Sequence, residues 1–125
     1  LQRRASPNVE FLGSVDRARI IEKLAYAQSL ILPGIEDFGI TPLEAMALGT
    51  PVVAYRAGGA LDTVADRVSG IFFDEPVVES LQSALDEVEK RQWDRDELRR
   101  HAAKFSRARF LEQFAASLDR LQSAR

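Results

Sequence analysis

Two glutamates, Glu36 and Glu44, lie eight positions apart in the segment IEDFGITPLEAMALGTPVVA (35–54), with Gly39 between them. Carboxylates accept two hydrogen bonds well from vicinal hydroxyls on a ring. If a helix begins near Pro42, its free N–H groups and positive dipole end form an anion site. Gly39 would allow that anion to approach the backbone closely. A phosphate flanked by two polyols describes a sugar nucleotide, so the pattern predicts a pocket for such a ligand.

The same residues also have a purely structural interpretation, a capping box at the start of a helix. Thr41 would be the N-cap, Pro42 the first helical residue and Glu44 the third. The Thr41 hydroxyl and the Glu44 carboxylate would each accept the other residue's N–H, contributing about 1 kcal/mol without a ligand. A cap leaves Glu36 and Gly39 unexplained, and it does not prevent the Glu44 carboxylate from facing a ligand. Both interpretations of Glu44 therefore stay open.

The composition is that of one globular domain. The chain has 125 residues, of which 46% are hydrophobic and 29% charged, with a formal net charge of −2. The near-neutral charge argues against nucleic acid as a partner, and no apolar run approaches the roughly 20 residues of a membrane span. The lack of cysteine excludes disulfides and thiolate metal sites, and it fits a reducing, cytoplasmic location.

Short apolar runs alternate with helical patterns along the first 75 residues. Strands are predicted at 8–13, 29–33, 51–55 and 70–73, and the run at 29–33 is typical of a strand buried on both faces. Helices are predicted at 15–28 with Asp16 as N-cap, at 42–48, after the pair Gly58–Gly59, and at 77–91, 94–104 and 106–122. This alternation indicates right-handed crossovers and a parallel sheet. We therefore expect an α/β, doubly wound half-sheet of about four strands (1–75) with a helical C-terminal tail (76–125).

Three loops leave predicted strands at the same edge of this sheet. They are LGSVD (12–16), GIEDFGITP (34–42) and RAGGA (56–60). Ligands of parallel α/β sheets bind beyond the carboxyl ends of the strands. The loop with Glu36 is thus expected to lie where such sheets bind their ligands.

Residues 33–73 resemble the C-terminal half of retaining glycosyltransferases with the GT-B fold, in the large family 4 group. The signature of that group is a glutamate, seven intervening residues and a second glutamate, followed by E-A-x-A-x-G-x-P-V-V. Every element is present, at Glu36, Glu44, Ala45, Ala47, Gly49, Pro51, Val52 and Val53. The resemblance extends back to about Asn8, and HAAKFSRARF (101–110) is similar to the family near the end. It implies a Rossmann-like sheet that binds a nucleotide-sugar donor.

The resemblance also implies roles for individual residues. Glu36 would act at the catalytic centre, holding hydroxyls of the transferred sugar near its anomeric carbon, and Glu44 would bind the ribose. The backbone amides of Phe38, Gly39 and Ile40, assisted by Thr41, would contact the sugar and the diphosphate. Gly13, Ser14 and Val15 would lie near the base. Gly58 and Gly59 belong to a neighbouring loop of the site. Such enzymes typically need no metal, since a helix dipole and cationic side chains stabilise the leaving diphosphate.

The sequence EDFGITPLEA (36–45) is similar to the corresponding segment of bacterial mannosyltransferases of polysaccharide assembly. It favours GDP-mannose as donor, with a UDP-sugar as the other expectation, no cofactor, and a glycan or lipid-linked acceptor. A lipid-linked acceptor would place the full-length protein on the inner face of a membrane. The alternative, from a different class, is a non-catalytic module of α/β fold that binds phosphate, a nucleotide or another protein.

The resemblance covers only part of an enzyme. The chain lacks an initiator methionine, its only one being Met46, so we expect it to be processed or cut from something longer. Two strands, an Arg and Lys pair that grips the diphosphate, and an N-terminal acceptor domain precede residue 8 in the family. Without those strands an apolar edge is bare. We expect direct strand pairing, dimerisation or strand exchange to cover that edge. For this chain alone we expect weak or no donor binding and no sugar transfer.

Three features further along favour structural interpretations. His101, the only histidine, is expected to be a surface or packing residue, and Trp93 to join two helices. The arginines and lysine between 91 and 109 alternate with acids, which is typical of a solvated helix with ion pairs along one face.

Overall fold

The computed structural model describes residues 1–125, built on a three-stranded parallel sheet. The strands are β1 (Leu30–Leu32), β2 (Val52–Tyr55) and β3 (Gly70–Phe73), in the order β1-β2-β3. Val53 of β2 lies in register with Ile31 of β1 and Ile71 of β3. The predicted α/β class, parallel pairing and helical tail are confirmed, with one strand fewer than expected.

Six α-helices and one short 3₁₀-helix accompany the sheet. Their bounds are η1 Gln2–Arg4, α1 Arg17–Tyr26, α2 Ile40–Ala47, α3 Ala60–Thr63, α4 Val78–Lys90, α5 Arg95–Ala103 and α6 Arg107–Ser123. Three of them begin at side-chain N-caps, because Asp16, Asp94 and Ser106 each accept a backbone N–H of the first turn. The predicted helices therefore all form, within a few residues of the expected bounds.

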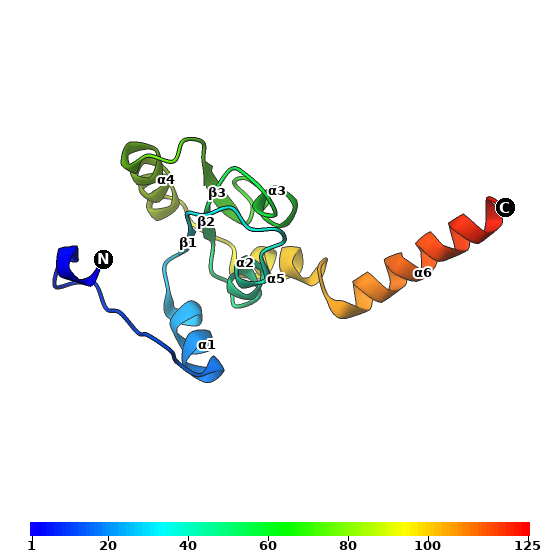
Figure 1. Cartoon of the computed structure of the whole chain (residues 1–125), viewed down its shortest axis with the longest axis horizontal. Coiled ribbons are helices and arrows are strands. Elements are labelled where there is room, and N and C mark those ends of the chain that lie inside the picture. Colours follow the sequence, from blue (N-terminus) through cyan, green and yellow to red (C-terminus); the bar gives the residue numbers. More distant parts are fainter.

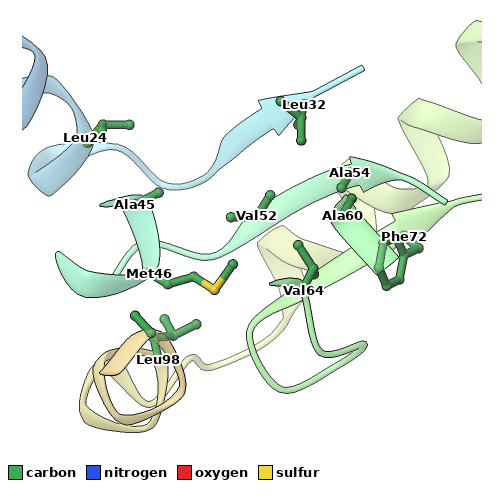
Figure 2. Close-up of a cluster of buried hydrophobic side chains, with 11 residues drawn as sticks. Leu24, Leu32, Ala45, Met46, Val52, Ala54, Ala60, Val64, Phe72 and Leu98 are labelled. Atoms are coloured by element: carbon green, nitrogen blue, oxygen red, sulfur yellow. The ribbon is translucent and has the colours of Figure 1, made fainter. Parts of the chain in front are cut away.

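β2 and β3 are buried on both faces of the sheet, and each face has its own core. One face packs against α1, α2, α3 and α5, and Figure 2 shows Met46 of α2 and Leu98 of α5 next to each other beneath Val52. The other face packs against α4, through Ala84 and Val88. This arrangement explains why β2 is apolar at successive positions rather than at every second one.

Two expectations about the first half of the sheet are wrong. Residues 8–13 form no strand, and Val9 and Phe11 are about half exposed, because no strand of the chain lies beside them to pair with their backbone. β1 is consequently an edge strand and is not buried on both faces. Ile31 is 43% exposed, since α4 packs mainly against β2 and β3 and Ile31 is not part of the core on that face. Direct strand pairing, one of the expected ways to cover the edge, is not used within the chain.

Both ends of the chain extend away from the sheet. In Figure 1 the first residues run outward before α1, and α6 points away on the opposite side. α6 contains no buried residue and exposes Phe110 and Phe114, whose rings stack at 5.8 Å. None of the helices combines the length and the apolar character needed to cross a bilayer.

The structural interpretations of His101 and Trp93 are confirmed. Trp93 follows α4, donates its indole N–H to the Val88 carbonyl at 2.9 Å and packs against both cores. His101 lies on α5, partly buried, with Nε2 2.8 Å from the Thr63 carbonyl oxygen. The basic residues of this region do form ion pairs with neighbouring acids, as between Arg99 and Asp96 at 2.9 Å.

Candidate functional site

The loops that follow β1 and β2 lie against each other beyond the carboxyl ends of the strands. The Gly59 amide donates to the Glu36 carbonyl at 2.6 Å, which joins the two loops through their backbones. A Cβ at Gly59 would lie 2.5 Å from the Phe38 oxygen, and one at Gly58 would lie 2.6 Å from the Glu36 oxygen. The glycine pair is thus explained by close packing between loops, whether or not it also contacts a ligand.

The start of α2 differs from the predicted capping box. The N-cap is Gly39, in the left-handed conformation with φ of 88°, and no side chain caps the helix. Because Gly39 adopts this conformation, the helix begins at Ile40, so Thr41 is already its second residue and Glu44 its fifth. The Thr41 side chain accepts no backbone hydrogen, and the reciprocal bond from Glu44 is absent. The capping-box prediction is therefore wrong.

The new helix start leaves several backbone donors free. The amides from Phe38 to Thr41 have no hydrogen-bond partner in the chain, and all four residues except Gly39 are exposed. Residues 35–41 alone line a shallow groove of about 590 Å³ over these amides. Free N–H groups at a helix N-terminus with a glycine beside them suit an anion.

The two glutamates occupy different surroundings at this end of the sheet. Glu36 is exposed, with its carboxylate unpaired in the groove. The Glu44 carboxylate forms an ion pair of 2.9 Å with Arg17 of α1, and the Glu44 side chain is 30% exposed. Glu44 also lines an apolar hollow with Phe38, Ile40 and residues of α5. The carboxylate that was expected to cap a helix thus points toward α1 instead.

The residues expected near a nucleotide base lie in the loop before α1. Gly13 has φ of 63°, and Val15 lines a separate shallow hollow with residues of α1 rather than the 35–41 groove. The Arg17–Glu44 pair connects the end of this loop to α2. The structure therefore brings Glu36, Phe38, Gly39, Ile40, Thr41, Gly58 and Gly59 together, with Glu44 adjacent. Gly13, Ser14 and Val15 do not line that groove.

Arg17 is a neighbour of the site that the sequence did not indicate. It follows the Asp16 cap and is 27 positions before Glu44, so no local pattern connects the two. Thr63 and Phe105 were also missed. Thr63 is fully buried behind the glycine pair, and the Phe105 ring meets the edge of the Phe38 ring at 6.4 Å.

The arginine at the end of β2 is already paired. Arg56 Nε lies 2.5 Å from the Asp74 carboxylate, and its guanidinium is 3.6 Å from Asp66 and stacks over the Phe72 ring at 4.5 Å. The hydrogen bond to Asp74 is the main cause that raises the pKa of Arg56. Burial, the next effect, lowers this pKa, and the charges of Asp74 and Asp66 raise it. This cation is therefore engaged by protein acids and does not face the 35–41 groove.

A three-stranded parallel sheet with helices on both faces places the chain in the Rossmann-like α/β class of folds. The profile of the family described as "Glycosyl transferases group 1" matches residues 1–109. The chain belongs to this glycosyltransferase family, and the resemblance read from residues 33–73 is confirmed.

Curated relatives agree with the family. The chain is 33% identical over 110 residues to a D-inositol 3-phosphate glycosyltransferase of Jonesia denitrificans, covering 84% of this chain and 26% of that protein. It is 35% identical over 123 residues to the protein of the same name in Mycolicibacterium smegmatis, covering 94% and 28%. A GDP-mannose-dependent monoacylated alpha-(1-6)-phosphatidylinositol monomannoside mannosyltransferase of Corynebacterium glutamicum is 35% identical over 91 residues, covering 66% and 24%. The chain thus spans about a quarter of the length of these relatives.

Proposed function

We propose that this chain provides the donor-binding part of a retaining glycosyltransferase. The observation that carries the proposal is the run of unpaired amides from Phe38 to Thr41, with Glu36 in the same groove and Glu44 on the next turn of α2. The amides and the α2 dipole would hold the diphosphate. Glu36 would accept hydrogen bonds from the hydroxyls of the sugar near its anomeric carbon, and Glu44 from those of the ribose.

The Arg17 pair bears on the proposed role of Glu44. An exposed ion pair is weak and exchanges readily with other partners, so the carboxylate can turn from Arg17 to a ribose without a large cost. Gly13, Ser14 and Val15 would then lie near the base, since their loop leads into α1, whose Arg17 contacts Glu44. Gly58 and Gly59 would support the 34–39 loop and stand beside the sugar.

GDP-mannose is the proposed donor, with a UDP-sugar as the second candidate. The name of the Corynebacterium glutamicum relative supports mannose as the donated sugar. The sequence of residues 36–45, which is similar to that of bacterial mannosyltransferases, supports the same sugar. The proposed reaction transfers mannose or a related hexose to a glycan or lipid-linked acceptor, without a metal or cofactor. Such an acceptor would place the whole protein in the cytoplasm, on the inner face of a membrane.

Transfer by the whole protein would need more than these residues. The relatives are about four times longer. Two arginines at this end of the sheet are engaged by protein acids, Arg17 by Glu44 and Arg56 by Asp74. We therefore propose that the chain alone binds donor weakly and transfers no sugar, and that an N-terminal domain binds the acceptor. The exposed edge of β1 would be covered in the whole protein, in a homodimer or by strand exchange.

Calorimetric titration tests the proposal. The chain is titrated with GDP-mannose, UDP-glucose and inorganic phosphate, and the titrations are repeated on Glu36→Gln and Glu44→Gln. A matched control is Glu89→Gln, an exposed glutamate of α4 on the opposite face of the sheet. Sugar-nucleotide binding that weakens only in the first two variants supports the proposal. Turnover of a sugar nucleotide by this chain alone would contradict the predicted inactivity.

One observation favours a second function, a phosphate-binding or interaction module without catalysis. The groove itself contains no cation, so its backbone amides and the Thr41 hydroxyl are the groups that would attract an anion. If inorganic phosphate binds as tightly as either sugar nucleotide, and Glu36→Gln and Glu44→Gln have no effect, this second function replaces the first.

A further inference from the structure

The C-terminal end of α5 lies behind the proposed donor loop and is bonded to it through α3. His101 of α5 is partly buried, and its Nε2 is 2.8 Å from the carbonyl oxygen of Thr63, the last residue of α3. A carbonyl oxygen can only accept, so Nε2 carries the hydrogen. The only histidine of the chain is thus a donor to the backbone of a one-turn helix.

Thr63 continues this connection toward the loop. Its side chain is fully buried and its hydroxyl donates to the Gly59 carbonyl at 3.1 Å. The Gly59 amide in turn donates to the Glu36 carbonyl at 2.6 Å. Three successive hydrogen bonds therefore run from His101 through Thr63 and Gly59 to the backbone of Glu36.

A second contact holds the same loop from its side. The Phe105 ring meets the Phe38 ring edge-on at 6.4 Å and the His101 ring at 5.7 Å, also edge-on. Because Phe38 follows Glu36 by two residues, the backbone contact and the ring contact act on one short segment. Offset and edge-on ring pairs have defined geometry, so they restrict how this segment can tilt.

α5, which carries His101, is held firmly by the rest of the fold. Leu98 of α5 is fully buried in the main core, and Arg95 at the start of α5 donates to the carbonyls of Ala25 and Leu48 at 3.0 and 3.1 Å. α5 is therefore fixed to α1, α2 and the sheet independently of the loop. A movement of the 35–39 loop away from α3 and α5 would break the hydrogen bond from Gly59 to Glu36 or the contact between the Phe38 and Phe105 rings.

We propose that His101 is a positioning residue for the 35–39 loop, which it holds through Thr63 and Gly59 in the shape that presents Glu36 and the free amides of α2. This inference rests on the proposed function for the identity of the ligand. The hydrogen bonds that connect His101 to the loop do not depend on that function. His101 touches neither Glu36 nor the groove, so it acts only through other residues.

Amide hydrogen exchange of the chain tests the connection directly. In His101→Phe the ring contact with Phe105 is kept and the donor is lost, and in His101→Gln a side-chain N–H can still reach the Thr63 carbonyl. We expect the Gly59 amide to exchange about tenfold faster in His101→Phe and within about twofold of wild type in His101→Gln. The amide of Val53 in the central strand is the internal control and should not change.

If His101→Phe unfolds, amide exchange will accelerate throughout the chain and the comparison will be lost. A second variant provides a test in that case. Phe105→Leu removes the edge contact with Phe38 at a partly buried position. It should speed exchange in residues 36–39 and leave Val53 unchanged. Equal Gly59 exchange in wild type and His101→Phe, or equally fast exchange in His101→Gln, would overturn the proposal.

Donor titration separates this proposal from the one on which it rests. If the chain binds GDP-mannose, His101→Phe should weaken binding about tenfold and His101→Gln about twofold or less, as expected for a positioning bond. If wild type binds no sugar nucleotide, the proposed function fails, and the exchange data still decide whether His101 holds the loop.

Discussion

Arg17 of α1 and Glu44 of α2 form an ion pair of 2.9 Å beside the proposed donor groove. The pair joins the loop at residues 13–15 to the helix whose N-terminus is free, although the two residues come from separate elements. The Arg17 side chain is 75% exposed. Because an ion pair with an exposed partner exchanges readily, the contact with Arg17 leaves the Glu44 carboxylate available for a ligand.

Removing either member of this pair should separate binding from stability. Because Arg17 is largely exposed and Glu44 partly so, Glu44→Gln and Arg17→Gln should each change the free energy of unfolding by less than about 1 kcal/mol. Only Glu44→Gln should weaken sugar-nucleotide binding. Urea denaturation and calorimetry measure the two quantities, and a larger loss of stability in Glu44→Gln without a loss of binding would show that Glu44 is structural.

The glycine at position 59 should tolerate no side chain. In Gly59→Ala the new methyl would meet the Phe38 and Asp37 carbonyls at 2.5 and 2.6 Å, so we expect a loss of about 1–3 kcal/mol in unfolding free energy. Gly34→Ala is the matched control, since its Cβ would meet no atom within 4 Å. Chemical denaturation of both variants checks this, and equal stabilities would mean that the two loops are not in contact.

Thr41→Ala and Asp94→Ala distinguish the observed helix starts from the predicted one. Asp94 accepts the amides of Asp96 and Glu97 at 2.9 and 3.2 Å, so its replacement should cost about 1 kcal/mol. Thr41 caps nothing and is exposed, so its replacement should stay within about 0.5 kcal/mol. Thermal unfolding followed by circular dichroism measures both. A cost at Thr41 as large as at Asp94 would restore the capping box.

The network around Arg56 should stabilise the fold without making it sensitive to pH near neutrality. Its pKa is higher in the folded chain than in the unfolded one, so its contribution is complete below the unfolded pKa and is lost only as pH rises through the folded pKa. Arg56→Gln should therefore lower unfolding free energy by about 1 kcal/mol or less, equally at pH 6 and pH 9. Denaturation at both pH values tests this, and a difference that changes between them would contradict it.

Local features were predictable from the sequence. The apolar runs at 51–55 and 70–73 form strands, and Asp16 caps its helix, because each depends on residues close to it in sequence. The motif around Glu36 and Glu44 identified the family for the same reason.

Features that depend on distant partners were not predictable. Residues 8–13 have the composition of a strand but no neighbour to pair with, and Thr41 has the spacing of a cap but Gly39 starts the helix earlier. The bonds of Arg17 to Glu44 and of His101 to Thr63 join elements 27 and 38 positions apart, which no helical or strand period reveals.

The hydrogen bond from Arg95 to the Ala25 carbonyl spans 70 positions and has a consequence for synthesis. The strands and both proposed ligand loops lie before residue 75, yet the core beside α2 closes only when Leu98 and Ala102 of α5 arrive. A nascent chain whose residues 30–73 have emerged from the ribosome therefore still exposes the apolar side of its sheet. Long-range contacts of this kind delay folding and leave apolar surface open to aggregation. The family motif is thus translated well before the helix that completes its support.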